Sequence, residues 1–198
     1  MRIWLGFLAV LGLTLVAAVI LLVRTSVPEL PAMGELPPFT FTNQTEQRVD
    51  NEALRGKVWI ANFMFTSCPT ACPALTRTMK TLVEDLPERE DLQFVSFSVD
   101  PETDTPAVLR EYADRFDADS NRWWFLTGDP AVVSATVVRG FHLHLGERVP
   151  VDGGTVYDIM HAVRFVLVDQ EGQIRGYYSS DAEGLGNLRR DARELLDS

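Results

Sequence analysis

After residue 38, the hydrophobic and polar positions of the chain alternate between strand-like and helix-like patterns. Short apolar runs suited to strands occur at Val58–Phe65, Leu92–Val99 and Trp123–Leu126, and a shorter signal comes from Phe39 and Phe41, which alternate with threonines. The first run is almost continuously apolar, which predicts a central strand that is covered on both faces.

Between these runs, apolar residues recur at helical spacing. One helix is predicted up to Leu86, and a second is predicted to begin with Thr105 as its cap and Pro106 in its first position. A short helix is predicted over Pro130–Arg139. The apolar faces of the first two helices comprise Leu75, Met79, Leu82, Val83 and Leu86, and Val108, Leu109, Tyr112 and Phe116.

The last part of the chain combines a hairpin signal with a helix signal. The apolar segments Ala162–Val168 and Ile174–Tyr178 flank the turn sequence Asp169-Gln170-Glu171-Gly172, which predicts a β-hairpin. An amphipathic helix is predicted from about Leu185 to Leu196. The order of elements predicts an α/β, thioredoxin-like domain over residues 39–198, with a central mixed sheet flanked by helices.

A separate hydrophobic segment stands at the N-terminus. No charge occurs from Ile3 to Val23, and as a helix this segment would be about 31 Å long, enough to cross a bilayer. A cleaved signal peptide would have a shorter apolar run and a small-x-small cleavage site, which is not found where the run ends. We therefore predict an N-terminal transmembrane helix, uncleaved, over residues 1–24.

Residues 25–38 contain four prolines and are predicted to be a proline-rich linker. Arg2 precedes the apolar segment, whereas Arg24 is followed by Glu29 and Glu35, a balance that favours a cytoplasmic N-terminus. In a bacterial cell the protein would be a single-pass protein of the inner membrane, with its soluble domain in the oxidising periplasm.

Composition and charge narrow the classes of function. Apolar residues make up 46% of the chain and charged residues 23%, which is typical of globular proteins. The formal net charge of -10 repels phosphate backbones, and no basic stripe stands out, so nucleic acid is not an expected partner. A domain of this size needs no disulfide for stability, so its two cysteines need another explanation.

The two cysteines follow the central strand directly, where α/β sheets commonly bind ligands. The spacing of Cys68 and Cys72 places them on one side of a helical turn, with Cβ atoms about 5–6 Å apart, and regular helix is predicted to begin near Pro73. A helix N-terminus is expected to lower the pKa of a thiol. The pair could exchange with disulfides, form a structural disulfide, or bind a soft metal with further ligands.

The histidines and methionines offer candidate ligands of unequal weight. His161 immediately precedes the segment Ala162–Val168, which is predicted to adjoin the central strand, so it is either a third ligand or a hydrogen-bonded structural residue. His142 and His144 alternate with apolar residues and are predicted to share a solvated strand face. Met64 and Met160 could supply thioether ligands, although core packing is favoured for both.

The cysteine segment resembles the signature of a known family. The stretches Gly56–Trp59 and Phe63–Pro73 look like those of the Sco (SenC) copper proteins, and Ser98–Thr105, His161 and Val168–Gly172 agree with that family in order and spacing. The resemblance covers the chain from about residue 39 onward, and an N-terminal anchor and proline-rich linker are also usual in that family.

The resemblance implies that Cys68, Cys72 and His161 bind copper, as Cu(I) or Cu(II), and that the two cysteines form a redox disulfide in the apo form. It implies a metallochaperone without catalytic residues, which delivers copper to, or reduces the cysteines of, the binuclear copper site of cytochrome c oxidase. A copper donor protein would be a second partner. Two thiolates suit Cu(I) and an imidazole suits Cu(II). Zinc accepts the same ligands, so the resemblance, and not the ligand set, assigns the metal.

One departure from the family concerns the neighbours of the histidine. Many members have Asp before it and Ser or Thr after it, whereas this chain has Met160 and Ala162. A hydrogen-bond acceptor for the imidazole is therefore expected from Asp158 or Asp100. For Asp100, a role as a turn or capping residue is an equal alternative.

Two other functions remain open. A thiol–disulfide oxidoreductase of the same fold would normally place a cis-proline before the strand that faces the cysteines, where this chain has Ile159-Met160-His161. The absence of proline favours metal binding over exchange. A redox or copper sensor would use the same cysteines and histidine and is not separated from a chaperone by the sequence.

Overall fold

The computed structural model describes residues 30–68, 72–151, 156–161 and 163–198, the side chains of Val156, Met160 and His161 excepted. The predicted transmembrane helix over residues 1–24 lies outside these residues, and no helix among the residues described is long and apolar enough to cross a membrane. The chain divides into two units, Met1–Leu30 and Pro31–Ser198, and the fold described below belongs to the second unit.

A mixed eight-stranded sheet in the order β1-β10-β9-β4-β5-β6-β2-β3 forms the centre of the domain. The central strand β4 pairs in parallel with β5, which pairs in parallel with β6, and β4 pairs antiparallel with β9 on its other side. The strands of this sheet are β1 (Gly34–Glu35), β2 (Thr40–Asn43), β3 (Arg48–Asp50), β4 (Val58–Met64), β5 (Leu92–Ser98), β6 (Trp123–Thr127), β9 (Phe165–Val168) and β10 (Gln173–Tyr178).

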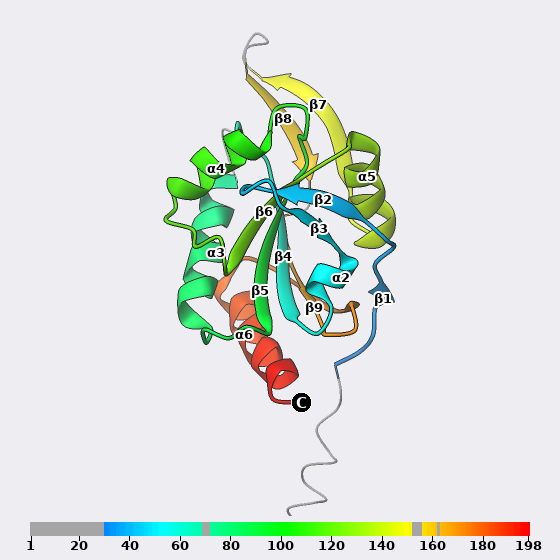
Figure 1. Cartoon of the computed structure of the whole chain (residues 1–198), viewed down its shortest axis with the longest axis vertical. Helices are drawn as coiled ribbons and strands as arrows, with labels where there is room; N and C mark the ends of the chain where they lie inside the picture. The colour runs from blue at the N-terminus through cyan, green and yellow to red at the C-terminus, as the bar shows by residue number, and fades with distance from the viewer. Residues whose placement is uncertain (1–29, 69–71, 152–155, 162) are drawn as a thin grey trace, which may run out of the picture. The chain divides into compact units, whose positions relative to one another are not determined.

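Helices cover the sheet, as Figure 1 shows, with α3 and α6 on one side and α5 on the other. Every residue of β4 and β5 is buried, as expected for strands that lie between two layers. The helices are α2 (Asn51–Leu54), α3 (Cys72–Asp85), α4 (Pro106–Asp114), α5 (Pro130–Ala135) and α6 (Ala182–Leu196).

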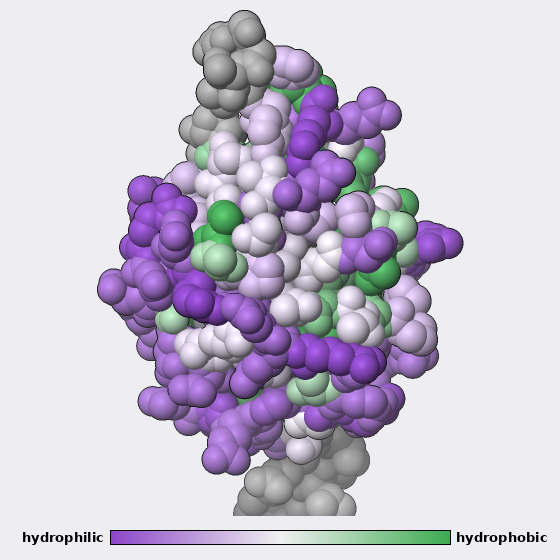
Figure 2. Space-filling model, turned by 45° about the horizontal axis from the view of Figure 1, so that its top comes forward, coloured by the Kyte–Doolittle hydropathy of each residue, from purple (hydrophilic) through white to green (hydrophobic). Residues whose placement is uncertain are grey.

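An aromatic cluster fills one side of the core. Its centre is Phe97 of β5, whose ring lies 5.2–6.3 Å from the rings of its neighbours. These neighbours are Phe39, Phe41, Trp59, Phe63 and Phe141. Because each ring is buried and tilted or stacked on another, the cluster ties β2, β4 and β5 to the segment after α5. The surface is more polar: the face in Figure 2 is mostly hydrophilic, with small hydrophobic patches.

Several predicted elements are confirmed within one or two residues. The strands over 58–64, 92–98 and 123–127 are present, and the Thr105 hydroxyl caps α4 by accepting from the amide of Val108, with Pro106 in the first turn. The predicted hairpin is β9–β10, whose turn ends at Gly172 with a φ of 85°, a conformation that glycine adopts readily.

The region between α5 and β9 differs from the prediction. The short helix ends at Ala135, and one π-helical turn, η1 (Thr136–Gly140), follows it. His142 and His144 were predicted to lie on a strand, but residues 141–144 form none, and His142 has a φ of 52°. Both histidines are exposed, in agreement with the solvated position predicted for them.

A second, two-stranded sheet was not predicted at all. It consists of β7 (Leu145–Val151) and β8 (Val156–His161), which pair antiparallel to each other and not with the main sheet. Figure 1 shows this hairpin at the end of the domain where α3 begins. The strand predicted to begin at Ala162 instead begins at Phe165, so His161 ends β8 and is separated from the central sheet by residues 162–164. The apolar pattern did not reveal this break, because Val163 continues the alternation of Phe165 and Leu167 although it is 43% exposed.

Part of the segment predicted to be a linker contacts the domain. Gly34 and Glu35 form β1, which pairs with Ile174 and Gln173 of β10, and the amide of Met33 donates to the carbonyl of Ile174 over 2.8 Å. Leu36 is buried. The end of the segment is therefore part of the folded unit.

Candidate metal centre

The two cysteines converge in the turn between β4 and α3. Cys72 is the first residue of α3, and its backbone amide donates to Cys68 Sγ over 3.5 Å. Cys68 follows β4 after a turn in which its own amide donates to the carbonyl of Phe65. Both side chains are buried. The expected placement of two sulfurs at the carboxyl end of the central strand is thus observed.

Burial changes the acid–base behaviour of this pair. It raises the pKa of the Cys72 thiol above its ordinary value, and the neighbouring Cys68 and the more distant Asp158 raise it further, against a lowering by a hydrogen bond with the Phe65 backbone. The prediction that a helix N-terminus lowers the thiol pKa is wrong for Cys72. Burial removes water from the thiolate, and this effect outweighs the favourable helix end. A cation that binds here would have to displace the thiol proton.

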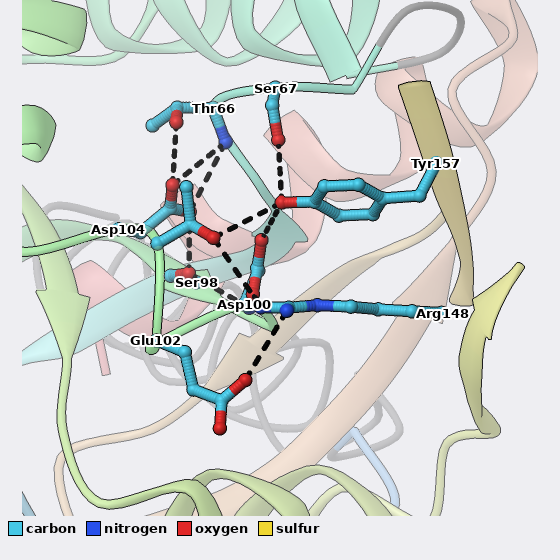
Figure 3. Close-up of polar contacts among 9 residues, drawn as sticks. Thr66, Ser67, Ser98, Asp100, Glu102, Asp104, Arg148 and Tyr157 are labelled. Atoms are coloured by element: carbon cyan, nitrogen blue, oxygen red, sulfur yellow. Dashed lines mark hydrogen bonds and ion pairs between the residues drawn. The ribbon is translucent and has the colours of Figure 1, made fainter. Parts of the chain in front are cut away.

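A buried carboxylate fixes the start of the cysteine turn. Asp104, which is fully buried, accepts hydrogen bonds from the Thr66 amide over 3.1 Å, from the Thr66 hydroxyl over 2.5 Å and from the Ser98 hydroxyl over 2.6 Å. Burial raises the pKa of Asp104, although the bonds from Ser98 and Thr66 act in the opposite direction. The loop after β5 is thereby joined to the turn that carries Cys68, as Figure 3 shows.

His161 belongs to the β7–β8 hairpin and not to the main sheet. Its Cα is paired with that of Leu145 at the end of β8. The same hairpin touches the cysteine turn: the Tyr157 ring stacks on the Phe65 ring with centroids 5.9 Å apart, and the Ser67 hydroxyl donates to the Tyr157 hydroxyl over 3.0 Å. The backbone that carries His161 is therefore attached to the residues that precede Cys68.

Asp100 lies at the centre of a polar cluster between the hairpin and the loop after β5 (Figure 3). Its carboxylate accepts hydrogen bonds from the Arg148 guanidinium and from the Tyr157 hydroxyl. Arg148 also pairs with Glu102 over 3.3 Å, and its guanidinium lies 4.9 Å from the centroid of the Tyr157 ring. The Asp100 side chain is only 1% exposed, so its charge is compensated by hydrogen bonds and by Arg148.

The other candidates are placed less directly at the site. The Asp158 carboxylate accepts from the amide of Ile159 over 2.9 Å and lies within electrostatic reach of Cys72. Met64 is fully buried in β4, in agreement with core packing. The side chains of His161 and Met160 lie outside the description, and the residues that are described contain no group of three His, Cys, Asp or Glu side chains arranged for a metal. The ligand set Cys68, Cys72 and His161 stays a prediction.

Sequence reasoning did not find Asp104, Arg148 and Tyr157. Asp104 lies in the stretch Ser98–Thr105 of the family resemblance, which gave it no role, and Arg148 and Tyr157 lie in strands that were not predicted. The sequence does contain a signal for β8. Tyr157, Ile159 and His161 occur at every second position, which is the spacing of residues on one face of a strand.

The comparisons with known proteins decide the family. The family model described as SCO1/SenC matches residues 29–196. The chain belongs to the SCO1/SenC family. Three solved structures of related proteins match the domain closely. A SCO1/SenC family lipoprotein from Bacillus anthracis is 33% identical, with a TM-score of 0.70 over 82% of this chain and 95% of that one.

The two other structures carry descriptions that concern chemistry. ScoI from Bradyrhizobium japonicum, solved with copper bound, is 25% identical, with a TM-score of 0.68 over 82% of this chain and 100% of that one. BsSco is 32% identical, with a TM-score of 0.70 over 85% of this chain and 96% of that one. It is described as having a disulfide switch and as a member of the Sco family of cytochrome c oxidase assembly proteins. The thioredoxin-like fold expected for a Sco protein is confirmed.

Proposed function

We propose that this Sco protein is a copper metallochaperone that holds copper through Cys68, Cys72 and His161. The convergence of two buried cysteines at the end of β4 carries the proposal, because the amide of Cys72 lies only 3.5 Å from Cys68 Sγ. A copper-bound relative supports the choice of metal. Two sulfur donors suit Cu(I), and a histidine supplied by an adjacent hairpin would suit Cu(II).

The cargo would pass to the binuclear copper site of cytochrome c oxidase, after arriving from a copper donor protein. The description of BsSco as one of the oxidase assembly proteins supports this role. Three protein ligands would leave a coordination position open, so an incoming thiolate could take the copper without release of a free ion. The protein would act as a carrier and not as an enzyme.

A redox role for the same cysteines is the second candidate. The disulfide switch described for BsSco favours it, because Cys68 and Cys72 lie close together here as well. In the apo form the pair would reduce a disulfide of the oxidase site: two electrons pass to the target, two thiols form there, and Cys68 and Cys72 become a disulfide. A sensor would use the same change to alter its contacts with a partner.

Membrane attachment through residues 1–24 belongs to the proposal, with a linker that runs from residue 25 to the start of the folded unit at Pro31. The relative from Bacillus anthracis is a lipoprotein. In this chain the uncharged segment from Ile3 to Val23 would supply the membrane attachment, with the domain in the periplasm.

The test uses the full chain, purified in detergent and reduced, with Cu(II) added. We expect an intense thiolate-to-copper charge-transfer band and nitrogen hyperfine structure in the electron paramagnetic resonance spectrum. Cys68→Ser or Cys72→Ser should abolish the band, and His161→Ala should remove the nitrogen signal. His144→Ala is the matched control, because His144 is exposed and outside the strands.

The outcomes separate the candidate functions. A reduced wild type that shows no band, yet turns over disulfide substrates, would establish the exchange enzyme. A copper spectrum that His161→Ala leaves unchanged would remove the histidine from the ligand set while keeping the cysteines.

A further inference from the structure

The β7–β8 hairpin is held to the domain by little apolar burial. All seven residues of β7 are described, and none of them is buried; Val149 is 58% exposed. In β8, Ile159 is buried and Tyr157 is half-buried. A two-stranded hairpin is marginally stable by itself, so the contacts that dock it decide how long it stays in place.

An open cavity lies beneath the hairpin. It has a volume of about 380 Å³ and is lined by residues of three regions: β7 and β8, the loop after β5, and α5. Its apolar lining includes Leu145 and Ile159 of the hairpin together with Val99 and Val133. Because this space is not filled by side chains, apolar packing contributes less to docking than it would in a close-packed interface.

Polar contacts supply the attachment that apolar burial does not. Arg148 of β7 and Tyr157 of β8 both donate to the buried Asp100 carboxylate, and Thr103 lies within 3.4 Å of both, at 3.4 Å from the Arg148 guanidinium and 3.2 Å from the Tyr157 hydroxyl. Tyr157 also accepts from the Ser67 hydroxyl. One residue from each strand of the hairpin is thus bound to the same carboxylate, and one of them reaches the residue next to Cys68.

We propose that Asp100, Arg148 and Tyr157 form a latch that docks the β7–β8 hairpin on the cysteine turn and so positions His161 toward copper. This role rests on the proposed function, since it assumes that His161 is a ligand. Strand alternation supports it: residues two apart in a strand share a face, so His161 occupies a register position on the same face as Tyr157 and Ile159. Arg148 and Tyr157 are positioning residues, and the latch acts through the hairpin backbone.

The first experiment measures the latch without copper. Hydrogen exchange is followed by mass spectrometry in the reduced full chain and in two variants, Arg148→Gln and Tyr157→Phe. The second variant loses the hydroxyl but keeps the ring that stacks on Phe65. We expect amides of β7 and β8 to exchange on the order of tenfold faster in each variant, because the docked hairpin opens more often, while amides of β4 are unaffected.

Arg175→Gln is the matched control. Arg175 also binds an aspartate that is 1% exposed, Asp169, but within the β9–β10 hairpin of the main sheet. The Arg175→Gln variant should leave the amides of β7 and β8 exchanging at the wild-type rate. Wild-type exchange of the β7 and β8 amides in both latch variants would overturn the latch. If the amides of β4 also exchanged faster in Arg148→Gln, that variant would have destabilised the whole domain. The exchange of the β7 and β8 amides in Tyr157→Phe would then decide whether the latch exists.

The second experiment asks whether the latch acts through His161. Copper affinity is measured by competition with a chelator for Arg148→Gln, His161→Ala and the double variant. We expect Arg148→Gln to weaken binding about tenfold, as loss of a group that orients a ligand typically does, and to have no further effect in the His161→Ala background. Equal weakening in both backgrounds would show that the latch does not position His161.

The two experiments distinguish failure of the proposed function from failure of the latch. A wild type that binds no copper would remove the proposed function, while the hydrogen-exchange result would still establish whether the three residues dock the hairpin. Faster exchange without any effect on copper would keep the docking contact and overturn its positioning role.

Discussion

Two hairpins of the domain, β7–β8 and β9–β10, each contain an arginine bound to a nearly inaccessible aspartate, yet the two pairs have different roles. Asp169 and Arg175 are six residues apart, and the same carboxylate accepts from the amides of Glu171 and Gln173, so the pair shapes its own turn. Asp100 and Arg148 are 48 residues apart and join a hairpin to a distant loop.

Burial explains this difference. All four residues of β9 are buried between β4 and β10, so the hydrophobic effect holds the β9–β10 hairpin whether or not its ion pair is present. The β7–β8 hairpin lies outside the main sheet and is mostly exposed. A hairpin held by polar contacts can move without unfolding the domain, which would suit the proposed role of bringing His161 to copper and releasing it.

The largest effect is expected from the core of the main-sheet hairpin. Leu167→Ala in β9, at a fully buried position, should lower the free energy of unfolding by about 2–5 kcal/mol, because it removes buried methyl groups and leaves a cavity. Urea unfolding followed by circular dichroism measures this. Val163→Ala, at a 43% exposed position just before β9, is the control and should change it by less than about 0.5 kcal/mol. Equal effects at both positions would contradict the burial argument.

The same contrast explains which elements could be predicted from the sequence. The almost continuous apolar run of β4, the strand signal of β5 and the Thr105-Pro106 helix start follow from local rules, and the structure confirms them. The SCO1/SenC family was also identified from residues near the cysteines. These features depend on burial and capping, which leave a clear pattern.

The hairpin that carries His161 left no such pattern. The β7 sequence, Leu145-Gly146-Glu147-Arg148-Val149-Pro150-Val151, has no buried face to impose alternation. His161 was therefore assigned to the next apolar segment, Ala162–Val168, although the strand there starts at Phe165. Likewise, Asp104 acts through Thr66, which lies 38 positions away in the sequence, and Arg148 acts through Asp100, which lies 48 positions away. Local periodicity cannot reveal contacts over such distances along the chain.

Removing the aspartate of each pair should separate the two roles. Asp169→Ala is expected to cost about 1–3 kcal/mol of unfolding free energy, because the amides of Glu171 and Gln173 lose their acceptor. Asp100→Ala should cost less than about 1 kcal/mol, because Arg148 is 40% exposed and can be solvated by water. Chemical denaturation of both variants tests this, and a larger loss in Asp100→Ala would show that the outer hairpin is part of the global folding unit.

A smaller, pH-dependent difference is expected at Asp104, the buried aspartate that fixes the start of the cysteine turn. Its partners Thr66 and Ser98 are neutral, and burial raises its pKa in the folded state above the ordinary value of 3.8. Between these two pKa values the folded state binds more protons than the unfolded state, so this contribution to stability is fully present below the unfolded pKa and is lost as pH rises through the folded pKa.

Asp104→Asn tests this sign, because asparagine does not titrate. The unfolding free energy of the wild type minus that of the variant should grow as pH is lowered toward 3.8, since contributions from other groups cancel in the difference. Urea unfolding at a series of pH values measures it. A difference that shrinks on acidification would mean that the carboxylate is favoured in the folded state, and that the bonds from Thr66 and Ser98 outweigh burial.

The smallest effect is expected on the outer face of β7. Val149→Thr should change the unfolding free energy by less than about 0.5 kcal/mol and leave hydrogen exchange in β8 unaltered, because Val149 is 58% exposed. Threonine keeps the β-branched shape that suits a strand, so only the apolar contribution of the position is tested. Destabilisation or faster exchange would show that an apolar contact of β7 helps to dock the hairpin, and the polar latch would then share that role with hydrophobic burial.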